Sequence, residues 1–171
     1  MVDGEIEKLA FFENTYWWHQ GKSQLVRNLI ELSKDKYNLR VKNSLEIGCG
    51  SGIILELLNE FGNATGIDIS TKAIEYCKHR GLKNLICGDI NLLKTEEFRG
   101  KYDLVVCLDV FEHLENDILV MRKIYELLNK NGVLIASVPA HKFLWSAHDE
   151  ALSHKRRYHI RELKGKLSDS G

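Results

Sequence analysis

Three glycines at alternate positions form the first group of residues in this chain whose spacing suits ligand binding. Gly48, Gly50 and Gly52 follow a short apolar segment and precede a helical pattern over 53–58, which is typical of a strand that turns directly into a helix. Glycine tolerates positive φ and has no Cβ, so a ligand can lie against the backbone of such a turn. We expect the N–H groups at the start of the helix to face that ligand.

Asp68 follows Gly48 by twenty residues and stands at the end of a second apolar segment, 64–68. In nucleotide-binding βαβ units, an acid at this position accepts hydrogen bonds from ribose hydroxyls. A structural turn followed by a solvated aspartate is the alternative. The pairing of loop and acid favours a site for a ligand that contains a nucleoside.

Apolar and helical segments that alternate along the chain must position these residues. Near-continuous apolar runs predict strands at about 44–48, 63–68, 83–87, 103–108 and 132–138. Helical patterns predict helices at about 22–32, 52–61, 71–80 and 115–129, a short one near 91–98 and another from Ile160. Such runs are typical of strands covered on both faces, so we predict an α/β fold with a parallel sheet. Its ligands bind beyond the carboxyl ends of the strands.

The start of the chain is aromatic, with Phe11, Phe12, Tyr16, Trp17 and Trp18. Such residues either pack on the flank of the sheet or cover a bound ligand as a lid, and both interpretations stay open. Gly21 is expected to interrupt this segment before the next helix, and 33–42 is expected to be a polar connector.

Composition excludes several classes of protein. The 171 residues are 44% hydrophobic and 28% charged with a formal net charge of zero, which gives no argument for a nucleic-acid or membrane partner. No apolar run is long enough to span a membrane, and the first residues lack the pattern of a signal peptide. The four cysteines have no metal-like spacing and suit a reducing cytoplasm, which is the expected location.

Four segments resemble, in order, motifs of the class I S-adenosylmethionine-dependent methyltransferases. They are LEIGCGSG at 45–52, GIDIS at 66–70, CGDI at 87–90 and DLVVCLDVFEHL at 103–114. The resemblance covers most of 40–140 and implies a Rossmann-like, doubly wound parallel sheet with strand order 3-2-1-4-5. It implies S-adenosyl-L-methionine as the cofactor and S-adenosyl-L-homocysteine as the product.

The resemblance also implies which residues hold the cofactor. Asp68 would bind the ribose, and Asp89 would accept a hydrogen bond from the adenine amino group, which an oxo group cannot donate. The residues implied are Glu46, Gly48, Cys49, Gly50, Gly52, Asp68, Ile69, Asp89, Ile90, Leu108 and Asp109. Asp109 has an alternative role as the cap of the helix expected near Glu115.

Glu112 and His113 follow the fourth strand, beside the position expected for the reactive methyl group. His113 is a candidate general base for a hydroxyl acceptor, because its pKa lies in the right range. The alternative is a histidine at the start of a helix that bonds the backbone. Methyl transfer from a sulfonium depends mainly on positioning, and a base helps only when the nucleophile arrives protonated.

The last segment, 141–171, is basic and rich in histidine, with seven Lys or Arg, four Asp or Glu and four His. Its pattern of Leu-Trp-Ser, His-Asp and His-x-Arg-Arg-Tyr resembles one bacterial and archaeal subgroup of the family, often discussed near glycan or lipid-linked sugar metabolism. Arginine pairs suit phosphate or carboxylate, so the expected acceptor is small or lipid-linked and anionic, and a solvated basic loop is the alternative. The residues expected to contact it are Trp18, His141, His148, Arg156, Arg157 and Tyr158.

No metal site is predicted. The candidate ligands of the last segment are His141, His148, Asp149, His154 and His159, and their spacings fit no standard set.

These observations divide the chain into an N-terminal helical and aromatic lid segment at 1–40, a cofactor-binding α/β core at 41–140 and an acceptor-side segment at 141–171. The family's sheet ends in an antiparallel hairpin, for which this chain has no residues after the expected fifth helix. An exposed sheet edge is therefore expected, and it favours a homodimer. Two other functions are weighed: a non-catalytic S-adenosylmethionine-binding scaffold, and an NAD-dependent dehydrogenase, whose wider Gly-x-Gly-x-x-Gly spacing the loop lacks.

Overall fold

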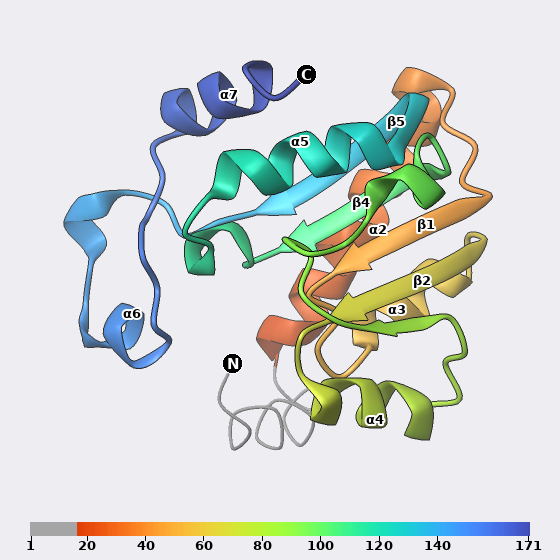
Figure 1. Ribbon diagram of the computed structural model, residues 1–171, viewed down its shortest axis with the longest axis horizontal. Coiled ribbons are helices and arrows are strands. Elements are labelled where there is room, and N and C mark those ends of the chain that lie inside the picture. The colour runs from red at the N-terminus through yellow and green to blue at the C-terminus, as the bar shows by residue number, and fades with distance from the viewer. Residues whose placement is uncertain (1–16) are drawn as a thin grey trace.

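The computed structural model describes residues 17–171, apart from the side chains of Trp18 and His19. Strands and helices alternate through the core (Figure 1). The elements are α2 (Trp17–Tyr37), β1 (Asn43–Ile47), α3 (Ile53–Asn59), β2 (Asn63–Asp68), α4 (Thr71–His79), β3 (Leu85–Cys87), η1 (Thr95–Phe98), β4 (Tyr102–Leu108), η2 (Phe111–His113), α5 (Asp117–Leu127), β5 (Leu128–Ser137), η3 (Lys142–Leu144), α6 (Ala147–Ala151) and α7 (Ile160–Ser168). Of these helices, none is long and apolar enough to cross a membrane.

The sheet contains five parallel strands in the order β3-β2-β1-β4-β5, which confirms the predicted fold class and strand order. In its register, Leu45 of β1 lies between Thr65 of β2 and Val105 of β4. The carboxyl ends of β1, β2 and β4 therefore meet at one edge, where the candidate site residues follow them.

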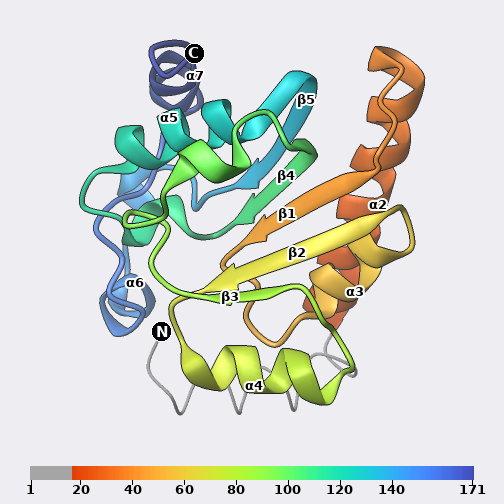
Figure 2. The ribbon, with the colours of Figure 1, turned by 45° about the vertical axis from the view of Figure 1, so that its right-hand side comes forward.

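Helices cover both faces of the sheet, with α2 and α3 on one side and α5 on the other (Figure 2). Within β4, Leu104 and Val106 pack in the core cluster that includes α2, α3 and α4. Val105 and Cys107 belong to the second cluster, with α5 and part of α7. Because alternate residues of a strand point to opposite faces, a continuous apolar run is what a sheet covered on both sides requires.

Helix α2 differs from the expectation, because it runs through Gly21 and continues to Tyr37. An interior glycine costs a helix about 1 kcal/mol relative to alanine, which tertiary packing readily offsets. Here Val26 and Ile30 are fully buried in the cluster that also contains α3. The prediction that Gly21 interrupts this segment was therefore wrong.

The chain after β5 forms an arm that leaves the sheet, turns through η3 and α6 and returns to α7 beside α5 (Figure 1). A backbone bridge between Ala140 and Tyr158 closes the base of this arm. Leu163 and Leu167 of α7 pack against the α5 cluster. The return of the arm brings residues 154–158 against η2 and the start of α5.

Candidate functional site

The glycine loop between β1 and α3 is held in shape by its own N–H groups. The N–H groups of Gly48 and Cys49 both donate to the carbonyl of Ile67, at 2.8 and 3.1 Å. Gly50 N–H donates to a carboxylate oxygen of Asp68 at 2.9 Å, and Gly52 N–H donates to the carbonyl of Cys49. These four N–H groups of the loop therefore have partners within the protein. The expectation that the N–H groups at the start of the helix face a ligand stays a prediction.

Close packing explains why the loop needs glycine. Gly48 and Gly52 have φ of +75° and +91°, in the left-handed region that disfavours other residues. A Cβ at Gly48 would lie 2.6 Å from the side chain of Val110. A Cβ at Gly52 would lie 2.6 Å from Leu82 and 2.9 Å from the sulfur of Cys77. The contact with Val110 also places the segment that follows β4 directly against the loop.

Asp68 ends β2 beside this loop, and both oxygens of its carboxylate bond the backbone. Oδ2 accepts from Gly50 N–H and Oδ1 accepts from Ser70 N–H, each at 2.9 Å. A carboxylate has about four acceptor positions, so two remain for a ligand. The next residue, Ile69, is 66% exposed and presents an apolar surface at the same edge.

Asp89 lies next to this position in space, because the Gly88 N–H donates to the Asp68 carbonyl. One oxygen of Asp89 accepts from both the backbone and side-chain nitrogens of Asn91, each at 2.8 Å. Ile90 is buried, whereas Leu92 is 80% exposed. The structure thus gathers the glycine loop, Asp68 and Asp89 at one edge, and their roles toward the cofactor stay predictions.

Glu46 is buried within β1, two residues before the loop. Cys49 is buried within the loop, and its sulfur lies 3.9 Å from that of Cys77.

Asp109, which follows Leu108 at the end of β4, does not cap α5. Its carboxylate pairs with Lys22 of α2 and accepts a hydrogen bond from the Ser137 hydroxyl at 2.7 Å. Asn116 caps α5 instead, accepting from Leu119 N–H at 3.0 Å. The capping alternative for Asp109 was therefore wrong. Sequence spacing gave no signal for Lys22, since it lies 87 positions from its partner.

Glu112 and His113 belong to η2, the short turn after β4. The Glu112 side chain is 1% exposed, and burial raises the pKa of its carboxyl to about 8. The His113 ring meets the His154 ring edge to face, with 4.8 Å between centroids. His154 comes from the arm and was not among the site residues predicted from the sequence.

The arm is fixed by a buried ion pair between Asp149 and Arg157. Arg157 donates from Nε and Nη2 to the two carboxylate oxygens of Asp149, at 2.7 and 2.8 Å. His154 Nδ1 lies 2.9 Å from the same carboxylate, which is fully buried. The Arg157 guanidinium in particular holds the pKa of the Asp149 carboxyl well below its usual range.

Arg156 and Tyr158 also bond within the protein. Arg156 donates to the carbonyls of Leu114 and Glu115 and pairs with Asp117 at 3.1 Å. The Tyr158 hydroxyl is buried and donates to Asp117 at 2.8 Å. These contacts assign structural roles to both residues.

The acceptor-binding prediction therefore lacks support from the contacts of Arg156, Arg157 and Tyr158 and stays a prediction. His141 and His148 are exposed on the arm. The side chain of Trp18 and the aromatic residues Phe11, Phe12 and Tyr16 lie outside the described residues.

A five-stranded parallel sheet with a glycine loop after β1 and an acid after β2 defines a class of α/β proteins that bind nucleoside cofactors. The comparisons with known proteins agree. A family model described as "Methyltransferase domain" matches residues 17–171. The chain belongs to this family, and the expected class, the class I S-adenosylmethionine-dependent methyltransferases, is confirmed.

Individual relatives are more distant. A ubiquinone biosynthesis O-methyltransferase from Shewanella pealeana is 27% identical over 145 residues, which are 78% of this chain and 61% of the relative. The chain thus spans about three fifths of the length of that relative. An S-adenosylmethionine-dependent methyltransferase from Archaeoglobus fulgidus has a similar structure, with a TM-score of 0.75, 24% identity and coverage of 96% of this chain and 73% of its own.

A further similar structure is the N-methyltransferase NodS from Bradyrhizobium japonicum, solved in complex with S-adenosyl-L-homocysteine. Its TM-score is 0.69 at 21% identity, with coverage of 92% of this chain and 76% of its own. These structural likenesses establish the fold.

Proposed function

We propose that this chain binds S-adenosylmethionine at the glycine loop and transfers its methyl group to a hydroxyl oxygen of a small or lipid-linked acceptor. The observation that carries the proposal is the loop itself. The N–H groups of four loop residues (Gly48, Cys49, Gly50 and Gly52) bond Ile67, Asp68 and Cys49, so these four are not directed at a pyrophosphate. Such a loop suits a nucleoside without a pyrophosphate and argues against the NAD-dependent alternative, which uses those donors.

The cofactor would lie across the carboxyl ends of β1, β2 and β3. Asp68 would accept from the ribose hydroxyls and Asp89 from the adenine amino group, with Ile69 and Ile90 beside the base. The remaining residues proposed to contact the cofactor are Glu46, Gly48, Cys49, Gly50, Gly52, Leu108 and Asp109. When bound, S-adenosylmethionine supplies an electrophilic methyl group on a sulfonium.

The acceptor is proposed to be a hydroxyl compound. The curated relatives are named as O-methyltransferases. In the transfer, an acceptor oxygen bonds the methyl carbon as the carbon–sulfur bond breaks, and the hydroxyl proton passes to a base. His113 is proposed as that base. The proposal does not include an anionic acceptor, because the guanidinium groups of Arg156 and Arg157 form hydrogen bonds within the protein.

Asp68→Asn tests the proposed cofactor site, and Asp103→Asn is its matched control. Asp103 also accepts from two backbone N–H groups, those of Lys42 and Asn43, but at the opposite end of the sheet. Both variants disturb a backbone cap, yet only Asp68→Asn replaces the charged acceptor proposed for the ribose with a neutral amide. One charged hydrogen bond contributes about 1.5–3 kcal/mol, so calorimetry should show a roughly 10- to 150-fold weaker affinity for S-adenosylmethionine in Asp68→Asn alone.

Equal affinities in the two variants would contradict this placement of the cofactor. Release of S-adenosylhomocysteine from radiolabelled S-adenosylmethionine, measured with a panel of phenols and polyprenyl alcohols, then separates the enzyme from the scaffold alternative. Binding without release would support the scaffold.

A homodimer remains a prediction. In the described sheet, β5 hydrogen-bonds with β4 alone, so its outer edge offers backbone groups to a second copy. Analytical ultracentrifugation tests this. A single monomer species across micromolar concentrations would contradict it.

A further inference from the structure

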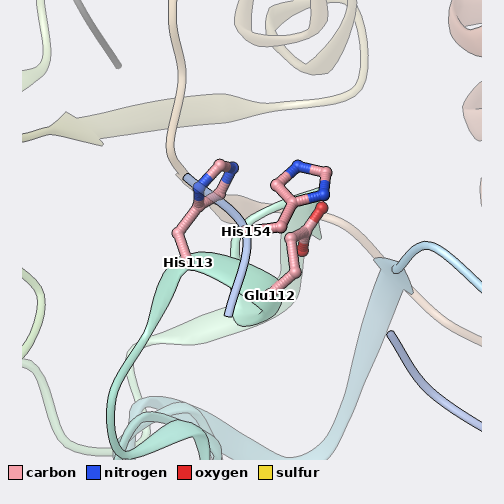
Figure 3. Close-up of side chains that lie close together, drawn as sticks. All are labelled: Glu112, His113 and His154. Atoms are coloured by element: carbon pink, nitrogen blue, oxygen red, sulfur yellow. The ribbon is translucent and has the colours of Figure 1, made fainter. Parts of the chain in front are cut away.

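Three side chains with metal-binding chemistry meet beside the glycine loop. Glu112 and His113 come from η2, and His154 comes from the returning arm (Figure 3). One potential ligand atom from each residue lies within 4.8 Å of the other two. The cluster therefore joins two segments about forty positions apart in the sequence.

Glu112 is an unusual acid in this position. Its side chain is 1% exposed, and within the described part of the chain its Oε2 has no hydrogen-bond partner. Its backbone carbonyl accepts from Lys155 N–H at 2.8 Å, which holds the arm against η2. A buried carboxyl oxygen without a partner is costly, and a bound cation would give it one.

His154 is oriented for binding. Its Nδ1 lies 2.9 Å from Asp149, whose carboxylate is ionised beside Arg157 and can only accept a hydrogen bond. The proton of neutral His154 is therefore on Nδ1, which leaves the lone pair on Nε2. A carboxylate behind a histidine in this way fixes the tautomer and ring orientation of metal ligands.

The charges around the cluster are compatible with a cation. Lys22 pairs with Asp109, and Arg157 pairs with Asp149. Lys155 and Arg156, which follow His154, pair with Glu115 and Asp117. These cations thus have acidic partners, while Glu112 forms no ion pair with the described residues at salt-bridge distance. A cation at the cluster would supply that missing charge.

We propose that Glu112, His113 and His154 bind one divalent transition-metal ion, with Zn²⁺ or Mn²⁺ as the fitting class. Two imidazole nitrogens and one carboxylate oxygen form a known ligand set of open metal sites, whereas Mg²⁺ prefers oxygen ligands. Ligand atoms about 2.1 Å from an ion lie at most about 4.2 Å apart, so the observed spacing closes with small side-chain rotations.

The place of this site gives the ion a role. Val110, two residues before Glu112, packs against Gly48 of the cofactor loop. The cluster therefore belongs to the segment that lies against the cofactor loop. The acceptor hydroxyl would bind the ion, which lowers the pKa of the hydroxyl, and its proton would pass to water. This role rests on the proposed function and replaces His113 as the base, because a ligating imidazole nitrogen cannot accept a proton.

Calorimetric titration of tag-free, chelator-treated chain with Zn²⁺ tests the inference, together with the visible spectrum of the Co²⁺-loaded chain. The variants are Glu112→Gln and His113→Ala, with His79→Ala as the control, since His79 is exposed at the end of α4. We expect one ion per chain and at least tenfold weaker affinity in both site variants. His79→Ala should bind as the wild type does, and melting curves confirm that each variant is folded.

The same samples are titrated with S-adenosylmethionine, so that the two proposals can fail separately. Absence of stoichiometric Zn²⁺ binding, or equal binding by all variants, overturns the metal site even where the cofactor binds. Zn²⁺ binding that depends on Glu112 and His113 supports the metal site even where the cofactor fails to bind.

Discussion

Gly52→Ala should destabilise the protein much more than Gly81→Ala, although both glycines have a left-handed backbone. Their φ values are +91° and +82°, so a side chain at either position costs about 1–2 kcal/mol in backbone strain. Around Gly81 the space within 4 Å is open among the described residues, whereas a Cβ at Gly52 would lie 2.6 Å from Leu82 and 2.9 Å from Cys77. Such overpacking adds about 1–3 kcal/mol.

The difference between the two variants therefore measures the crowding of the cofactor loop alone. Urea unfolding followed by circular dichroism should give a free energy of unfolding about 1–3 kcal/mol lower in Gly52→Ala than in Gly81→Ala. For a domain of this size the melting temperatures should differ by roughly 2–12 °C. Equal losses in the two variants would refute the close packing of α3, α4 and the loop on which the site depends.

Two further predictions concern the returning arm and its anchor on α5. Tyr158→Phe removes a buried hydrogen bond to the charged Asp117 and should lower the free energy of unfolding by about 1.5–3 kcal/mol, whereas Tyr125→Phe on the exposed face of α5 should change it by less than about 0.5 kcal/mol. Similar urea midpoints for the two would contradict the assignment of Tyr158 as an anchor. The pKa of Asp117 is lowered, because burial, which raises it, is outweighed by hydrogen bonds from Lys166 and Tyr158 and the charge of Arg156. A lowered folded-state pKa stabilises the protein above the ordinary carboxyl pKa of about 4 and less as pH falls below it, so the advantage of wild type over Asp117→Asn should shrink between pH 6 and pH 3. An advantage that stays constant across that range would show that the Asp117 charge adds no stability.

The proposed cofactor site could be predicted from the sequence because its signals are local. A strand, a glycine loop and a helix are contiguous, and Asp68 stands at a fixed distance along the chain. The strand order followed from the family resemblance, and the structure confirms it. Spacing does not reveal that Ile67 and Asp68 accept hydrogen bonds from the N–H groups of the loop.

The acceptor side depends on contacts between distant segments, which spacing cannot show. The sequence suggests an anion-binding role for Arg157, but both carboxylate oxygens of Asp149 bind one edge of its guanidinium. The sequence does not indicate that Glu112 and His154 are neighbours, because only the folded arm brings them together at η2. No metal was predicted because the spacing rules apply within one segment, while this cluster is built from two.

The central claim is that the glycine loop binds S-adenosylmethionine as a nucleoside cofactor without a pyrophosphate. Isothermal titration of the purified chain with S-adenosylhomocysteine and, in parallel, with NAD tests it most directly. The structure predicts saturable binding of S-adenosylhomocysteine at one site per chain and no measurable heat with NAD. Binding of NAD alone, or of neither ligand, would contradict the account.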